Sequence, residues 1–147
     1  MAAPEPTADA PDPRPIVRID PPSAVSRFIY ESDKIFKATQ KPKPGAFLPE
    51  YYENRHETSV CHLDGCADDR VWQLGRTRRP GKTLHARVDL DVQQVVDHSL
   101  SCISAPEEDF QEHAVVIDWP DEKEEQKKIA VELATRAGEC KRPPTVA

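Results

Sequence analysis

The sequence lacks any run of about 18 apolar residues, the length that a helix needs to cross a lipid bilayer. Its first residues, MAAPEPTADAPDP, have neither the basic start nor the apolar segment of a secretory signal. We therefore expect a cytoplasmic protein with no membrane partner. In a reducing cytoplasm cysteines remain thiols, and this is the state expected for Cys61, Cys66, Cys102 and Cys140.

The short motifs of common enzyme classes are also missing. The chain contains no GxxxxGKS/T, GxGxxG, GxSxG or HExxH motif and no EF-hand loop. These absences leave nucleotide-binding, hydrolase and zinc-protease classes unsupported, and no cofactor is predicted. The formal net charge of −6 argues against nucleic-acid binding over the whole surface, but it allows a local basic patch.

Proline is abundant and unevenly placed, with many of the 15 prolines near the amino terminus. Residues 1–22 are rich in Pro and Ala and show no periodicity, so they predict a disordered tail. Residues 23–140 have an ordinary globular composition and predict a single domain. Residues 141–147, which contain Pro143 and Pro144, predict a second disordered tail.

Apolar periodicity within the domain predicts an α+β fold. Leu84, Ala86, Val88 and Leu90 alternate with polar residues, which is typical of a half-buried strand. Further strands are predicted at 27–30, 46–48, 58–63 and 114–119, and helices at 68–75, 91–100 and 122–137. Gly75 and Gly138 are expected to end helices, and Pro120 is expected to begin the last one. The predicted architecture is a small mixed sheet of four to five short strands with about three helices.

One polar strand face is the first candidate for chemistry. His85, Arg87 and Asp89 would share this face, and an imidazole, a guanidinium and a carboxylate together could form an acid/base and anion-holding site. His113, at the start of the strand that leads to the last helix, is a fourth candidate. The simpler interpretation is the solvated side of a half-buried sheet.

Two clusters of basic residues form a second candidate. A loop with Gly81 is expected at 76–82, and four cations there could hold a phosphate or an acidic partner: Arg76, Arg78, Arg79 and Lys82. A looser cluster consists of Lys34, Lys37, Lys41 and Lys43. If the clusters met in space they would form a basic face on an acidic protein, whereas the simpler interpretation is a solvated loop.

Cys61, His62 and Cys66 come closest to a metal-binding pattern. A tetrahedral zinc site needs four ligands, and no second pair of ligands lies nearby in the sequence. Adjacent residues of a strand also point to opposite faces, which separates Cys61 from His62. No metal is therefore predicted, with these three residues kept as weak candidates.

The order of motifs RFIYES, KPGAFLPE, ETSV, DDRVWQLG, LHARVDL, VVDHSL and HAVVIDWPDEKEEQKKIAVELATRA resembles a family of small bacterial proteins with no assigned activity. The resemblance covers most of residues 25–137. It implies a compact bacterial cytoplasmic domain and carries over no catalytic residue. Small proteins of this kind are associated with mobile elements and defence clusters.

Three functions remain open. The first is a non-enzymatic accessory or protein-interaction component of a bacterial operon, with another protein as its partner. The second is a small enzyme that acts on a nucleotide or nucleic acid through the His/Arg/Asp face. The third is a phosphate-binding or nucleic-acid-binding module that uses the loop at 76–82.

Overall fold

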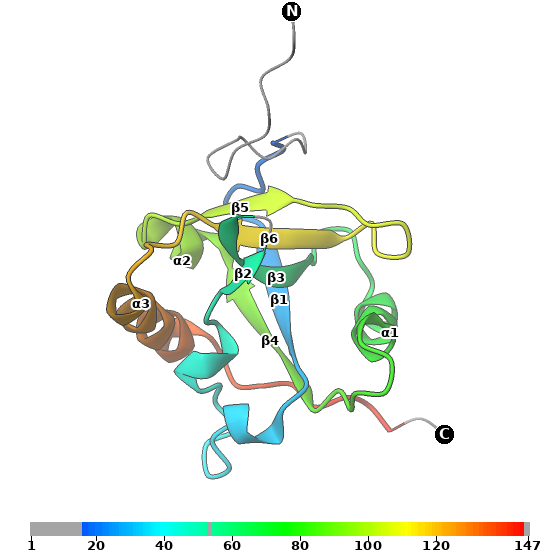
Figure 1. The fold of residues 1–147 in the computed structure, drawn as a ribbon. Coiled ribbons are helices and arrows are strands. Elements are labelled where there is room, and N and C mark those ends of the chain that lie inside the picture. Colours follow the sequence, from blue (N-terminus) through cyan, green and yellow to red (C-terminus); the bar gives the residue numbers. More distant parts are fainter. Residues whose placement is uncertain (1–15, 53, 146–147) are drawn as a thin grey trace, which may run out of the picture.

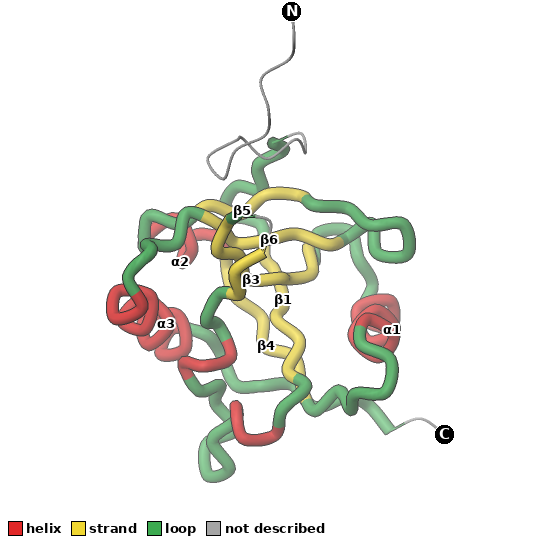
Figure 2. Tube along the Cα trace, viewed as in Figure 1, coloured by secondary structure: helices red, strands yellow, loops and turns green. Residues whose placement is uncertain are grey.

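The computed structural model describes residues 16–52 and 54–145 and confirms the α+β class. Three α-helices and six strands make up the domain (Figures 1 and 2). The helices are α1 (Asp68–Arg78), α2 (Val92–Asp97) and α3 (Lys123–Arg136). The strands are β1 (Ala24–Ile29), β2 (Glu50–Tyr52), β3 (Arg55–His62), β4 (Ala86–Asp91), β5 (Ser101–Ser104) and β6 (His113–Ile117). Two short 3₁₀ turns, Ser32–Lys34 and Pro44–Ala46, lie between β1 and β2.

The strands form one curved sheet in the order β4-β1-β3-β6-β5, and β2 pairs with the start of β3. These strand pairs are all antiparallel. Residues 92–100 connect β4 at one end of this order to β5 at the other, and α2 in that connection contacts both strands. The sheet therefore bends until its end strands approach each other, and Figure 1 shows β5 and β6 running across the direction of β1 and β4.

Helices α1 and α3 lie on opposite sides of the sheet (Figure 1). The larger core lies between α3 and the sheet, where Ala130 and Leu133 pack against Ala86, Val88 and Val116. The sequence pattern of this helix predicts one apolar face of Ile129, Ala130, Leu133, Ala134 and Ala137. The last four are buried, and Ile129 is partly buried against the same core. Small alanine side chains allow the helix backbone to lie close to the sheet.

A second core lies under α1, where Val71, Trp72 and Leu74 contact Phe28 and Cys61. Gly75 was predicted to end this helix, but α1 continues to Arg78. Gly75 instead provides space for close packing: a Cβ atom there would lie 2.8 Å from Cε1 of Phe28 and 2.9 Å from Cδ2 of Leu84.

Several element boundaries differ from the prediction. The predicted strand at 83–90 begins only at Ala86, and Leu84 packs with the α1 core rather than with Ala86 and Val88. The predicted strand at 46–48 is a 3₁₀ turn followed by loop. Strand β5, at Ser101–Ser104, was not among the predicted strands. Helix α3 begins at Lys123 rather than Pro120, because Pro120 still lies in the loop that joins β6 to the helix.

Both ends of the predicted domain extend into the segments assigned to tails. Ile19 is buried, and its amide donates a hydrogen bond of 2.9 Å to the carbonyl of Cys102 in β5. Lys141 and Arg87 exchange two backbone hydrogen bonds of 2.8 and 3.0 Å along the outer edge of β4. Residues 16–22 and 141–145 therefore lie on the domain, while residues 1–15 and 146–147 of the predicted tails lie outside the described residues.

Within residues 16–52 and 54–145, none of the helices combines the length and the apolar character that a membrane span requires.

We predict that Gly75→Ala destabilises the protein. The new methyl group would overlap Phe28 and Leu84, and overpacking of this kind costs roughly 1–3 kcal/mol. This cost exceeds the gain in helix propensity of about 1 kcal/mol. Urea unfolding measures the change in the free energy of unfolding.

Gly138→Ala is the matched control for Gly75→Ala, since nothing lies within 4 Å of a Cβ atom at position 138. Its effect should stay within about 0.5 kcal/mol. An equal effect at both positions would contradict the close approach of α1 to the sheet.

Candidate functional sites

The predicted His/Arg/Asp face is a buried ion cluster. Arg87 is 2% exposed and pairs with Asp68 at 3.0 Å and with Asp89 at 3.3 Å. Its guanidinium lies 5.0 Å from the centre of the Trp72 ring, and Lys141 closes the cluster with a contact of 2.7 Å to Asp89. The two carboxylates offset the buried charge of Arg87, although its Nε and Nη1 have no hydrogen-bond partner among the described residues. The cluster joins α1 and the carboxyl-terminal segment to β4.

His113 does not join Arg87 and Asp89. Asp89 pairs across strands with Ser26, Ser26 with Cys61, and Cys61 with His113. Three strand spacings of about 4.8 Å, roughly 14 Å in total, therefore separate the strand backbones at Asp89 and His113. His85 precedes β4 in an irregular segment, where its carbonyl accepts a hydrogen bond from Arg142. Of the four catalytic candidates, only Arg87 and Asp89 are brought together.

The four cations predicted to share a basic loop lie in different parts of the structure. Arg76 and Arg78 belong to α1, and Arg76 donates a hydrogen bond of 2.9 Å to the carbonyl of Pro144. Lys82 is exposed. Arg78 and Arg79 line a small cavity beside β1 and β3, and of the four cations only Arg79 also lines the larger hollow next to it.

The larger hollow, which we call the arginine cleft, has a volume of about 290 Å³ and lies between the end of β1, the segment at 45–50 and Arg79. Its charged lining residues are Arg27, Glu31, Lys34, Glu50 and Arg79. The cleft opens because β1 and β3 pair only at Val25–His62 and Ser26–Cys61 and then diverge. Lys34 and Arg79 come from the two basic clusters, so the clusters meet here at one residue each.

Arg27 fills the gap between the diverging strands. Its Nε donates to the carbonyl of Ala46 and its Nη1 to the carbonyl of Ser59, both at 2.9 Å. The side chain keeps some solvent exposure in the cleft, but its charged group lies deep enough that burial lowers the pKa of Arg27. Sequence reasoning missed this residue, although a charge between the apolar positions Val25 and Ile29 of one strand face was a usable signal.

Behind Arg27, a small cavity of about 20 Å³ reaches Ser59 and is also lined by Arg78 and Arg79. His113 Nδ1 lies 2.8 Å from the carbonyl of Ala105, and His113 Nε2 lies 3.2 Å from Ser59 Oγ. Since a carbonyl only accepts, Nδ1 carries the proton and Nε2 accepts from the serine hydroxyl. Burial lowers the pKa of His113, with a smaller contribution from Arg78, so the imidazole is neutral near pH 7.

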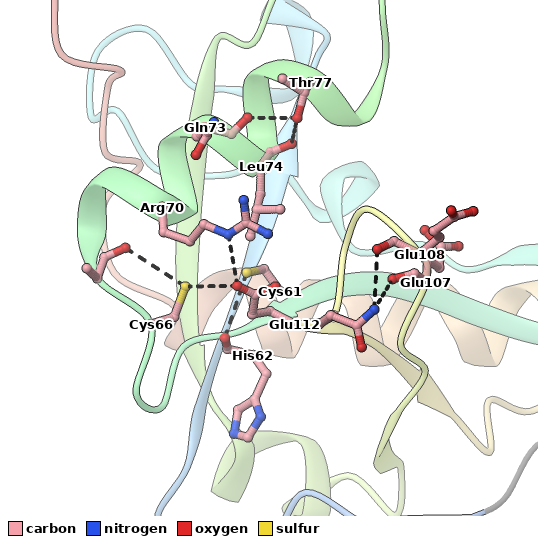
Figure 3. Close-up of polar contacts among 12 residues, drawn as sticks. Cys61, His62, Cys66, Arg70, Gln73, Leu74, Thr77, Glu107, Glu108 and Glu112 are labelled. Atoms are coloured by element: carbon pink, nitrogen blue, oxygen red, sulfur yellow. Dashed lines mark hydrogen bonds and ion pairs between the residues drawn. The ribbon is translucent and has the colours of Figure 1, made fainter.

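The three weak metal-ligand candidates, Cys61, His62 and Cys66, do not point toward a common centre. Figure 3 shows Cys61 and Cys66 near the carboxylate of Glu112, with the imidazole of His62 directed away from them. Cys66 Sγ lies 3.8 Å from Glu112 Oε2, which Arg70 Nε also contacts at 3.1 Å. Among the described residues, no three His, Cys, Asp or Glu side chains are arranged to hold a metal ion.

An apolar groove on the other side of the domain was not predicted. This lysine groove, of about 740 Å³, lies between α3 and the loop at 36–44. Its lining residues are Phe36, Lys37, Ala38, Thr39, Lys41, Pro42, Pro44, Val131, Ala134 and Thr135. Phe36 is 47% exposed and Val131 is 46% exposed, so two large apolar side chains remain in solvent there.

The loop wall of the lysine groove is held in place by the rest of the domain. The amide of Cys140 donates to the carbonyl of Gln40 at 2.7 Å, and Lys41 Nζ donates to the carbonyl of Thr135 at 3.1 Å. Lys43 Nζ lies 5.3 Å from the centre of the Phe36 ring. These contacts keep the groove open without a ligand.

No known protein family, curated protein or solved structure matches this chain. The resemblance to a small bacterial family therefore remains a prediction, and the sites rest on their own geometry.

We predict that His113 titrates below its usual pKa near 6.5, because burial disfavours the imidazolium. The unfolded state then binds more protons, so stability falls as pH drops through about 6.5. Proton NMR of the imidazole groups measures the midpoint, with the His113 signal assigned from its loss in His113→Gln. A midpoint at or above about 6.5 would contradict the buried, neutral imidazole.

We predict that iodoacetamide at pH 8 labels Cys66 well before Cys61 and Cys102. Burial raises the pKa of both Cys61 and Cys102 to about 12, whereas Cys66 is partly exposed. Burial raises the pKa of Cys66 as well, and Glu112 raises it further. Glu112→Gln should therefore speed labelling of Cys66, and Glu108→Gln should not.

Peptide mass spectrometry locates the labels. Equal labelling rates for Cys61 and Cys66 in the folded protein would contradict the enclosure of Cys61.

Proposed function

We propose that the protein is a non-enzymatic protein-interaction component whose lysine groove binds an acidic amphipathic segment of a partner protein. An accessory role in a bacterial operon is part of this proposal. The observation that carries it is the exposure of Phe36 and Val131 in a groove with lysines at its rim.

The apolar floor supports a protein ligand. Adjacent exposed apolar side chains in a hollow are typical of a recognition surface, whereas isolated ones are ordinary. Phe36 projects from the loop, Val131 from the outer side of α3, and Ala134 and Pro42 lie between them in the lining. A helix that presents residues at i, i+3 and i+4 would cover such a floor.

The rim determines the charge of the ligand. Lys37 and Lys41 line the groove, and Lys43 lies on the same loop, whereas the chain as a whole has a formal charge of −6. An acidic segment is therefore attracted to this one surface and repelled by much of the rest. Charge complementarity favours an acidic partner over a second copy of this acidic chain.

The geometry gives less support to the enzymatic alternative. His113 is separated from Arg87 and Asp89 by the strands between them. Arg87 is held in ion pairs with Asp68 and Asp89 and lies against the Trp72 ring. These contacts favour a structural role for two of the four residues proposed for catalysis.

We predict that peptides selected by the full chain from a random display library are acidic and amphipathic. Val131→Asp should weaken binding of a selected peptide at least tenfold, because it places a charge on the apolar floor and repels the ligand. Lys37→Glu should act in the same direction and should remove most of the salt dependence. Isothermal titration calorimetry measures both changes.

Val96→Asp is the matched control for Val131→Asp. Val96 is 45% exposed, nearly the same as Val131, but it lies on α2 outside the groove. Selected peptides that lack acidic residues, or binding that both Asp variants weaken equally, would overturn the proposal.

A further inference from the structure

We infer that the arginine cleft is a second binding site, which holds the phosphate group of a small phosphomonoester. The cleft lies between the end of β1, the segment at 45–50 and Arg79, and the lysine groove lies against α3. The two inferences therefore stand on separate residues and fail separately.

Arg27 provides the fixed part of this site. Its Nε and Nη1 bind the carbonyls of Ala46 and Ser59, which hold the guanidinium plane in one orientation. Its Nη2 has no hydrogen-bond acceptor among the described residues, and Arg27 lines both the cleft and the small cavity behind it. No carboxylate contacts this guanidinium closely enough to form an ion pair within the described part of the chain, so a ligand anion would neutralise it.

Arg79 and Lys34 provide the adjustable part. Arg79 follows the end of α1 and Lys34 ends the first 3₁₀ turn, so two separate segments each bring one cation to the cleft. Arg79 pairs with Glu50 at 3.7 Å, and both side chains of that pair are largely exposed. A phosphate can displace so weakly held a carboxylate, since a guanidinium binds phosphate through two hydrogen bonds at once.

The carboxylates in the cleft limit the charge that it accepts. Glu31 and Glu50 line it beside Arg27, Lys34 and Arg79, which leaves an excess of one positive charge. Arg78, in the adjoining cavity, is already paired with Glu107. This balance favours one phosphate group over a polyanion such as nucleic acid.

The dimensions of the cleft favour a small ligand. Its volume of about 290 Å³ lies at the lower end for ligand pockets, enough for a phosphate and a short organic group. Tyr30 forms part of the wall, with its hydroxyl held by the carbonyl of Gly75 at 2.7 Å. Ser59 lies at the inner end, where its hydroxyl already donates to the neutral His113.

The test is titration of the full chain with inorganic phosphate and with phenyl phosphate, followed by calorimetry and by ³¹P NMR. Both ligands should bind in the millimolar range or tighter, and binding should weaken as salt rises. Arg79→Gln should weaken binding at least fivefold. Glu50→Gln should strengthen it at least twofold, because it frees Arg79 and removes a repelling charge.

Arg76→Gln is the matched control, since Arg76 lies on the same helix but binds Pro144 outside the cleft. It removes the same charge and should change binding by less than twofold. Glu132→Gln on α3 is the control for Glu50→Gln. Equal losses for Arg76→Gln and Arg79→Gln, or no saturation by either phosphate, would overturn the inference.

Discussion

The structure depends on how one guanidinium, that of Arg27, fills the gap where β1 and β3 separate. The strands pair at only two positions before they diverge, and an open gap would leave buried carbonyls without donors. Arg27 donates to the carbonyl of Ser59 on β3 and to the carbonyl of Ala46 in the loop that crosses the gap. The hydroxyl of Thr58 holds the next carbonyl of this loop, that of Phe47, at 2.9 Å. The curved sheet, the loop and the arginine cleft are thus fixed by one small set of contacts.

Local sequence patterns predicted the elements whose burial depends on their own periodicity. The alternation of Ala86, Val88 and Leu90 and the alanine-rich face of α3 both reappear as buried surfaces. Strand β5 could not be found in this way, because its four residues are stabilised by partners distant in sequence. Cys102, for example, pairs with Val116 in β6, and its carbonyl accepts a hydrogen bond from the amide of Ile19. Gly75 was misread for a similar reason, since its close contact with Phe28 is visible only after α1 packs on the sheet.

Prediction of the sites reached only part of the way. The density of charge at 76–82 identified Arg78 and Arg79, but it could not separate them from Arg76, which turns toward Pro144. Alternation along β4 identified Arg87 and Asp89 as neighbours, but not the burial of Arg87 beneath Trp72. The lysine groove was beyond sequence reasoning, because Phe36 and Val131 are far apart in the chain and meet only through packing of the loop against α3.

The segments at the two ends of the domain protect the sheet edges. Residues 17–19 pair with the outer edge of β5, and Lys141 pairs with the outer edge of β4. Unpaired edges offer free backbone groups to strands of other molecules, which promotes aggregation. These short segments therefore cover backbone groups through which the sheet could pair with another molecule. A shortened chain that keeps every helix and strand of the core would still be more prone to aggregate.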